Sequence, residues 1–193
     1  MIRKGRYRMK WILASASPRR KELIAHICRE FEIKVADADE TVADTDCAQT
    51  VQTLALRKAL AIGPQEDAVV IGADTLVAIG QEILGKPKDR EDAARMLRLL
   101  SGNVHQVYTG VAIVAAGRQR VFYEKTDVYF APITPQELEY YLDTANYRDK
   151  AGAYAIQMDA AKFITRIDGC YHNVVGLPVG RLYQELKQME LLS

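Results

Sequence analysis

Residues 69–79 constrain the fold more than any other part of the chain. They form a continuous apolar run that a single charged side chain, Asp74, interrupts. Such runs are typical of strands that are covered on both faces, as in α/β domains. A carboxylate inside an apolar strand is costly to bury unless it is paired with a cation or bound to a metal. The stretch therefore predicts a central strand and, at Asp74, a residue with a structural partner or a function.

Strand-like and helix-like segments alternate along the rest of the chain. Apolar spacing and capping residues predict helices from Pro18, over residues 49–62 and 89–100, from the capping box at residues 134–137, and from Pro178 to about residue 189. Strands are expected at residues 11–14, 31–35, 104–115, 120–130 and 162–167. The pair within residues 104–130 has the pattern of an antiparallel hairpin. The chain is therefore expected to be an α/β protein with a mixed sheet flanked by helices.

Length and charge exclude several classes of protein. The chain has 193 residues, with 26 lysines and arginines against 25 aspartates and glutamates, and a formal net charge of +1. This balance argues against a protein that holds nucleic acid by bulk electrostatics. No apolar run approaches the roughly 18 residues of a membrane span, and no signal peptide is recognisable. We expect a cytoplasmic protein with one domain over residues 9–193, preceded by a basic tail at residues 1–8.

Cysteine and histidine do not indicate a metal centre or a disulfide framework. The cysteines, Cys28, Cys47 and Cys170, are odd in number and lack CxxC spacing. The three histidines are scattered, and none pairs with another at the spacing of metal ligands. Reduced thiols in a cytosolic protein are the simplest interpretation.

The first chemically informative segment is SASPRR, at residues 15–20. A strand that ends in small polar residues at a helix N-terminus exposes free backbone N–H groups, which favour anions. Arg19 and Arg20 add charge and bidentate donors for phosphate oxygens. The alternative is a capped surface helix with solvated arginines. No Walker GxxxxGK sequence is present, so a P-loop is not supported.

Three further positions can be read either as functional or as structural. In GADT, at residues 72–75, Asp74 is a candidate metal ligand or a base that activates water, and the small residues before it would let a ligand approach. A structural aspartate is the alternative. Lys86, in GKP at residues 85–87, is presented rigidly before a proline, or is an ordinary turn lysine. Lys58 shares the apolar face of its predicted helix, either as a snorkelling side chain or as a cation that faces a ligand.

The remaining candidates lie in predicted loops. An acidic cluster can hold Mg²⁺ or form a solvated loop, and its members are Asp37, Asp39, Glu40, Asp44 and Asp46. Residues 147–157 mix aromatic, small and cationic side chains, and Gln157 could read a base edge because an amide presents donors and an acceptor. Residues 169–178 form a second loop before a helix. Taken together, the cations and carboxylates predict a nucleotide-polyphosphate enzyme that uses no covalent nucleophile.

The ordered series of these segments resembles the Maf family of nucleoside triphosphate pyrophosphatases, also called septum formation proteins. The matching segments are LASASPRR at residues 13–20, GADT at 72–75, GKP at 85–87, KAGAYAIQ at 150–157 and NVVGLP at 173–178. The resemblance implies a fold related to the inosine triphosphate pyrophosphatases, with a curved mixed sheet and a cleft between two lobes. It also implies hydrolysis between the α- and β-phosphates, which yields a nucleoside monophosphate and pyrophosphate.

The resemblance also assigns roles to individual residues. It implies that a divalent metal, Mg²⁺ or Mn²⁺, assists the attack of water, with Asp74 as the base. The catalytic positions correspond to Asp74, Lys58 and Lys86. The substrate-binding positions correspond to Ser15, Arg19, Arg20, Thr75 and Gln157. The metal-binding positions correspond to Glu40 and Asp74.

Substrate preference and assembly are also implied by the resemblance. Arg19, Thr75 and Gln157 resemble the subgroup that prefers dTTP and UTP, with modified pyrimidine nucleotides as further substrates. The alternatives are a 7-methyl-GTP pyrophosphatase, a nucleotide sensor that does not hydrolyse, and a protein that binds a division partner. The resemblance suggests a homodimer with a small-molecule nucleoside triphosphate as ligand, and neither a nucleic-acid nor a membrane partner.

Overall fold

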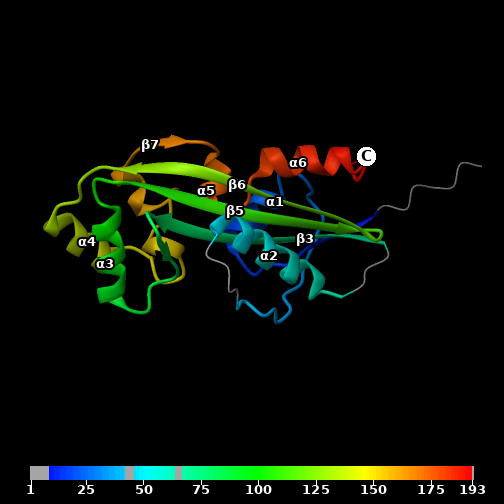
Figure 1. Ribbon diagram of the computed structural model, residues 1–193, viewed down its shortest axis with the longest axis horizontal. Coiled ribbons are helices and arrows are strands. Elements are labelled where there is room, and N and C mark those ends of the chain that lie inside the picture. The colour runs from blue at the N-terminus through cyan, green and yellow to red at the C-terminus, as the bar shows by residue number, and fades with distance from the viewer. Residues whose placement is uncertain (1–8, 42–45, 64–66, 193) are drawn as a thin grey trace, which may run out of the picture.

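A seven-stranded mixed sheet organises the computed structural model, which describes residues 9–41, 46–63 and 67–192 (Figure 1). The predicted basic tail, residues 1–8, lies outside the described residues. The strands are β1 (Lys10–Leu13), β2 (Glu32–Ile33), β3 (Ala68–Ile79), β4 (Glu82–Leu84), β5 (Val104–Ala115), β6 (Arg118–Phe130) and β7 (Ile164–Asp168). The helices are α1 (Pro18–Ile24), α2 (Cys47–Leu60), α3 (Arg90–Leu100), α4 (Pro135–Thr144), α5 (Tyr171–Val175) and α6 (Val179–Gln188). Two 3₁₀ turns, η1 (Ala151–Ala153) and η2 (Asp159–Phe163), precede β7.

The sheet combines parallel and antiparallel pairing, as predicted. Its order is β2-β1-β3-β5-β6-β7, with β1 parallel to both of its neighbours and the later strands antiparallel. The hairpin of β5 and β6 turns at Ala116 and Gly117, which both have positive φ angles of 48° and 72°. A two-residue hairpin turn in which both φ angles are positive has a backbone twist that matches the right-handed twist of the flanking strands. The strand β4, which folds back on β3, was not predicted.

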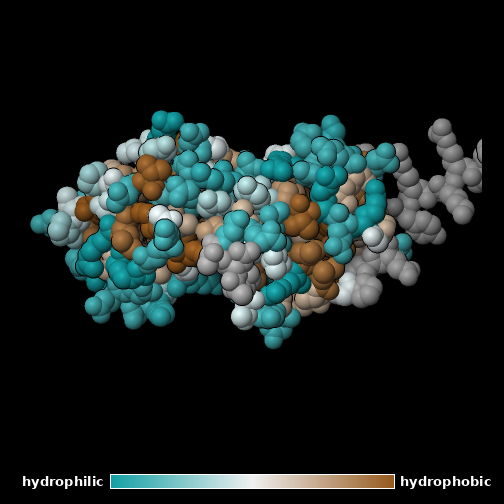
Figure 2. All heavy atoms as spheres, in the orientation of Figure 1, coloured by the Kyte–Doolittle hydropathy of each residue, from teal (hydrophilic) through white to brown (hydrophobic). Residues whose placement is uncertain are grey.

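Two lobes share the long strands β3, β5 and β6 (Figure 1). At one end, α3 and α4 cover the sheet with a cluster that includes Leu97 and Tyr141. At the other end, α1 and α6 cover one face with a cluster that includes Leu182, and α2 covers the opposite face. Apolar side chains reach the visible surface in two separate groups, one over each lobe (Figure 2). The middle of β3, which holds Asp74, therefore lies between the lobes.

Helix α2 packs directly on the backbone of the sheet because two glycines leave room for it. A Cβ atom at Gly72 would collide with the carbonyl oxygen of Ala55, and one at Gly110 would collide with that of Val51. The expectation that the small residues at 72 and 73 admit a ligand is therefore wrong. The space beside Gly72 is filled by α2, and Ala73 is fully buried. Close helix–sheet packing explains these residues.

Several element boundaries also differ from prediction. Helix α2 begins at Cys47, two residues early, because the Asp46 side chain caps it by accepting from the Ala48 N–H at 2.8 Å. Part of the predicted loop at residues 169–178 is helix α5, and residues 147–157 contain η1. All three cysteines are free thiols, as expected. Within the described ranges, no helix has the length and apolar character of a membrane span.

The α3/α4 lobe buries an imidazole at its centre. His105 is fully buried, and its Nε2 lies 2.7 Å from the Tyr154 hydroxyl. The rings of Phe130 and Tyr154 pack edge-on against it. Burial lowers the pKa of His105 to about 4, although Asp127 acts in the opposite direction. The folded protein therefore holds His105 neutral at a pH where an exposed histidine is charged.

Substitution of Gly110 by alanine is expected to destabilise the fold by about 1–3 kcal/mol, since the new methyl group would push α2 away from the sheet. Urea unfolding measures the change. Gly180→Ala is the matched control, because an added Cβ on this part of α6 meets no atom within 4 Å. That control is expected to be neutral or stabilising by up to about 1 kcal/mol. Equal effects of the two variants would contradict the close packing of α2.

Stability is expected to fall between pH 7 and pH 4.5 in part through His105. The unfolded chain, with a histidine pKa near 6.5, binds a proton in this window that the folded protein excludes. The loss from this group is about 2–3 kcal/mol. Urea unfolding of His105→Gln should show a correspondingly flatter pH dependence, whereas the exposed His26→Gln should match the unsubstituted chain. Identical slopes in all three proteins would refute the buried neutral imidazole.

Candidate active site

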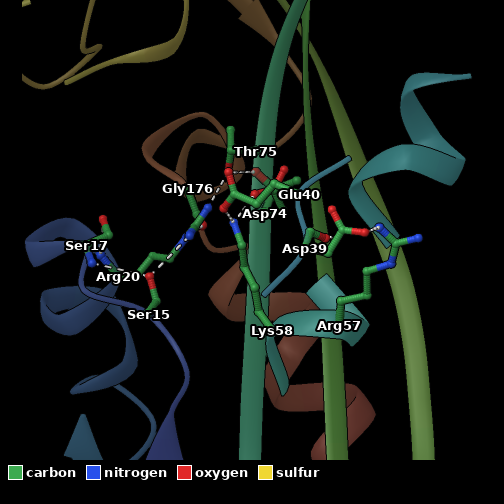
Figure 3. A network of polar contacts seen from close by, with 11 residues as sticks. Ser15, Ser17, Arg20, Asp39, Glu40, Arg57, Lys58, Asp74, Thr75 and Gly176 are labelled. Atoms are coloured by element: carbon green, nitrogen blue, oxygen red, sulfur yellow. Dashed lines mark hydrogen bonds and ion pairs between the residues drawn. The ribbon is translucent and has the colours of Figure 1, made fainter. Parts of the chain in front are cut away.

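The candidate site gathers side chains from three elements at the middle of the sheet (Figure 3). Asp74 and Thr75 come from the centre of β3, and Lys58 rises to them from α2. Arg20 approaches from α1, which starts at the end of β1. These residues are separated by up to 55 positions in the sequence, so the fold itself assembles the site.

Lys58 bridges two carboxylates. Its Nζ lies 2.6 Å from Asp74 Oδ1 and 2.8 Å from Glu40 Oε1. The side chains of Lys58 and Asp74 are only 19% and 13% exposed, whereas that of Glu40 is 68% exposed. Lys58 therefore acts as a cation directed at a charged site, which decides against a purely snorkelling role. Asp74 is an aspartate with a charged partner, and the site opens to solvent on the side of Glu40.

The acidic cluster resolves into residues with different contacts. Asp39 accepts from the Thr41 N–H at 2.8 Å and lies 3.8 Å from Arg57, while Asp46 caps α2. Glu40 is the described member that contacts Lys58. Its pKa is lowered, chiefly by the hydrogen bond and charge of Lys58 and further by the charges of Lys86 and Arg20. Asp44 lies outside the described residues.

Arg20 is held by three hydrogen bonds from its guanidinium. Nε donates to the Gly176 carbonyl at 2.9 Å, one Nη donates to Ser15 Oγ at 3.2 Å, and the other donates to Thr75 Oγ1 at 2.9 Å. A guanidinium has five N–H donors, so two remain for a ligand. Burial lowers the pKa of Arg20 below its ordinary value, while Asp74 acts to raise it. Arginine stays charged in proteins, so the site keeps a fixed cation.

A buried polar chain supports Arg20 from behind. Thr75 Oγ1 lies 2.9 Å from Thr109 Oγ1, and the Thr109 hydroxyl donates to the Asn173 carbonyl at 3.0 Å. Because a hydroxyl has one proton, Thr75 must donate to Thr109 while it accepts from Arg20. Its hydroxyl is thus already committed to positioning Arg20. Sequence reasoning did not single out Thr109, although it is a polar residue in the apolar second half of β5.

Lys86 approaches the site from a turn after β4, and Arg19 approaches it from the first turn of α1. The Gly85 carbonyl accepts from the Gly152 N–H at 3.0 Å, which ties the Lys86 turn to η1. The positive charge of Lys86 contributes to the lowered pKa of the Glu40 carboxyl. Arg19 lies 3.8 Å from Asp149, whose neighbour Lys150 is almost fully buried. Loop residues 147–152 therefore contact both the α1 side of the site and the Lys86 turn.

The predicted substrate residues do not all converge. Ser15 is buried and contacts Arg20, and Thr75 contacts it too. Gln157 is exposed after η1, and within the described part of the chain no hydrogen bond joins it to these residues. The structure therefore brings together Ser15, Arg20, Glu40, Lys58, Asp74 and Thr75 by direct contact.

A divalent cation fits the donors at this place. Asp74 and Glu40 converge on one ammonium, and Mg²⁺ is commonly held by one or two carboxylates together with substrate phosphates. The described residues contain no group of three or more potential metal-ligating side chains. The protein can thus supply part of a coordination shell that a polyphosphate would complete.

The fold and this site define a member of the Maf family. The family model described as Maf-like protein matches residues 10–189, and the chain therefore belongs to this family. The dTTP/UTP pyrophosphatase of Bacillus cytotoxicus is 48% identical over 183 residues, covering 94% of this chain and 96% of that protein. The dTTP/UTP pyrophosphatase of Bacillus cereus (strain B4264) is 46% identical over 184 residues, with the same coverage.

A solved structure shares the fold at much lower identity. The structure of a HAM1 protein from Coxiella burnetii superposes with a TM-score of 0.51 and 14% sequence identity. The match covers 93% of this chain and 99% of that one. It confirms the predicted class, an α/β protein with a single open mixed sheet flanked by helices.

Replacing Lys58 with methionine is expected to raise the pKa of Glu40 toward its ordinary range, because Lys58 is the main cause of the lowered value. A carboxyl with a lowered folded pKa adds stability above its ordinary pKa, and this contribution is lost as the pH falls through the folded value. Carbon-detected NMR titration measures the shift. Lys86→Met should raise the pKa less, and the exposed Lys88→Met should leave it unchanged. An unshifted Glu40 in Lys58→Met would contradict the bridge.

Proposed function

We propose that this chain is a nucleoside triphosphate pyrophosphatase that hydrolyses dTTP and UTP, or modified pyrimidine nucleoside triphosphates. The products are the nucleoside monophosphate and pyrophosphate. The observation that carries the proposal is the Lys58 ammonium between Asp74 and Glu40, beside the anchored Arg20. The substrate is supported by relatives named dTTP/UTP pyrophosphatase at 46–48% identity over almost the whole chain.

Phosphate binding is assigned to the fixed cations. Arg20 offers its two remaining N–H donors in an orientation that Ser15, Thr75 and Gly176 determine. A planar guanidinium with preset geometry suits paired phosphate oxygens. Arg19 and Lys86 add positive charge from either side, and residues 149–152 contact both Arg19 on α1 and the Lys86 turn. Binding of the triphosphate is therefore attributed mainly to these side chains.

Bond cleavage is assigned to Asp74. Its carboxylate takes a proton from a water molecule, whose oxygen attacks the α-phosphorus. The bond between that phosphorus and the oxygen that bridges to the β-phosphate breaks, and pyrophosphate leaves with the bonding electrons. Lys58 and Lys86 stabilise the negative charge that develops on the leaving group. Arg20 holds the phosphates so that the attacked phosphorus faces Asp74.

The metal and the base contacts complete the proposal. A divalent cation, Mg²⁺ or Mn²⁺, would be held by Asp74 and Glu40 and would neutralise phosphate charge and make water more acidic. We assign base recognition to Gln157 together with Arg19, and we assign to Thr75 the positioning of Arg20. A homodimer is carried forward from the family resemblance, and a cytoplasmic location from the expectation of reduced thiols, as parts of this proposal.

Asp74→Asn is expected to lower turnover by about 100- to 10,000-fold, because the amide cannot accept the proton. The assay incubates the purified chain with Mg²⁺ or Mn²⁺ and dTTP, UTP, CTP, GTP or 7-methyl-GTP. Chromatography then separates monophosphate plus pyrophosphate from diphosphate plus phosphate. Monophosphate is expected from dTTP and UTP.

The control is Asp168→Asn, which changes an exposed carboxylate on β7 and should leave turnover unchanged. Turnover confined to 7-methyl-GTP would refute the pyrimidine assignment and retain the enzyme class. Unchanged turnover in a folded Asp74→Asn variant would refute the role of Asp74. Binding of nucleotide without any product would favour a sensor over an enzyme.

A further inference from the structure

Helix α5 is fastened to the sheet by one buried amide. The Asn173 side chain is fully buried, and its Nδ2 donates to the Val107 carbonyl at 3.0 Å and to Thr126 Oγ1 at 2.9 Å. Val107 on β5 lies directly opposite Thr126 on β6, so the amide is bonded to both strands. A backbone carbonyl can only accept a hydrogen bond, so the amide atom that faces Val107 is the nitrogen. The orientation of the amide is therefore fixed.

The hydroxyl of Thr126 holds the start of α5 at the same place. It accepts from Asn173 Nδ2 and from the Cys170 N–H at 3.0 Å, and it donates to the Cys170 carbonyl at 3.2 Å. A hydroxyl donates once and accepts twice, so its capacity is fully used. A Cβ at Gly169 would come within 2.8 Å of the same oxygen, which keeps this approach to a glycine. We call the Asn173 amide and the Thr126 hydroxyl the α5 clamp.

The α5 segment in turn holds Arg20 by two routes. The Gly176 carbonyl, directly after α5, accepts from Arg20 Nε at 2.9 Å (Figure 3). The Asn173 carbonyl accepts from the Thr109 hydroxyl at 3.0 Å. Thr109 lies 2.9 Å from Thr75, which accepts from Arg20 at 2.9 Å. Both routes end on carbonyls of one short segment, so the position of α5 determines the orientation of the guanidinium.

Stability alone does not explain the amide of Asn173. Among the residues that the structure describes, its Oδ1 has no hydrogen-bond partner, although the side chain is fully buried. A buried acceptor without a partner lowers stability, which offsets part of what the two N–H bonds add. A group that gives up stability while it fixes a geometry is typical of functional sites.

We propose that Asn173 is a positioning residue of the active site. Its amide clamps α5 onto β5 and β6, so that the carbonyls of residues 173 and 176 hold Arg20 in the orientation that binds the phosphates. This role rests on the nucleotide hydrolysis proposed for the chain, in which Arg20 orients the substrate. Asn173 is buried and contacts no substrate, so it acts through Arg20.

A double-mutant cycle tests whether Asn173 acts through Arg20. Asn173→Ala is expected to lower kcat/KM for dTTP by up to about 100-fold, since a small misplacement of a group that orients substrate is costly. In an Arg20→Ala background the same substitution is expected to cause less than about a twofold further loss. A role in general stability would lower kcat/KM by the same factor in both backgrounds. Circular dichroism checks that each variant is folded.

The matched control is Asn103→Ala. Asn103 Nδ2 also donates to two carbonyls, those of Leu99 and Ser101 at 2.9 Å and 3.1 Å, but it is exposed beside the end of α3. Its replacement removes the same number of amide hydrogen bonds away from Arg20. This variant is expected to keep the kcat/KM of the unsubstituted chain.

A second measurement needs no nucleotide. Proton NMR follows the exchange with water of the Arg20 Nε–H, whose signal is identified by its absence in Arg20→Ala. Asn173→Ala is expected to speed this exchange by about tenfold or more, which corresponds to the loss of one charge-assisted hydrogen bond. Asn103→Ala is expected to leave it unchanged.

A pair of variants at Thr126 tests the clamp without an alanine-sized cavity. Thr126→Val keeps the shape and removes the hydroxyl, so it should lower kcat/KM and speed the exchange of the Arg20 Nε–H. Thr126→Ser keeps the hydroxyl and should recover most of both properties. If Asn173→Ala does not fold, this pair, combined with Arg20→Ala, provides the same test.

Three results would overturn the role of Asn173. They are an equal loss of kcat/KM with and without Arg20, an unchanged exchange of the Arg20 Nε–H, and a Thr126→Ser variant as impaired as Thr126→Val. If the unsubstituted chain hydrolyses no nucleotide, the proposed function fails, and the exchange measurement still decides whether the clamp holds Arg20. Hydrolysis without coupling between Asn173 and Arg20 refutes the positioning role and leaves the proposed enzyme standing.

Discussion

The site depends on how closely α2 lies against β3 and β5. Gly72 and Gly110 have no side chain, and the carbonyls of Ala55 and Val51 occupy the space that a Cβ would take. At this short separation, a lysine one turn beyond Ala55 reaches the centre of β3. The resulting contact between Lys58 and Asp74, at 2.6 Å, lets a carboxylate occupy a largely buried strand without an uncompensated charge.

The candidate active site therefore contains two kinds of cation, a flexible lysine and a fixed arginine. Lys58 has a flexible stem and shares its ammonium between two carboxylates, so it can adjust when another cation or a phosphate arrives. Arg20 is fixed by three hydrogen bonds, and the Thr75–Thr109–Asn173 chain behind it prevents rotation of the guanidinium. Phosphoryl transfer benefits from both kinds of cation. The fixed Arg20 can orient the phosphates, and the flexible Lys58 can move toward the negative charge that develops on them.

The long strands connect the site to the rest of the molecule. Strands β3, β5 and β6 extend from the lobe of α3 and α4 to that of α2 and α6, so the site lies where the two lobes share one sheet (Figure 1). Loop residues 147–152 extend from the first lobe toward α1 and contact Arg19 through Asp149. Among the described residues, the far part of β6 has no strand partner on its outer side, because β7 is short and pairs only beside the α3/α4 lobe.

The sequence by itself determined most of the helices and strands, though not β4 or α5, and the inventory of charges. The apolar run with Asp74 indicated a covered strand, the capping box marked the start of α4, and the resemblance of ordered segments gave the family that the comparisons confirmed. Only the tertiary structure decided that Gly72 accommodates a helix rather than a ligand, and that Thr75 holds Arg20. It also decided that Glu40, among the acidic residues it describes, meets Lys58. The reason is physical: spacing along the chain fixes which face of an element a side chain occupies, whereas contacts between Arg20, Lys58 and Thr75 depend on how elements far apart in sequence pack together.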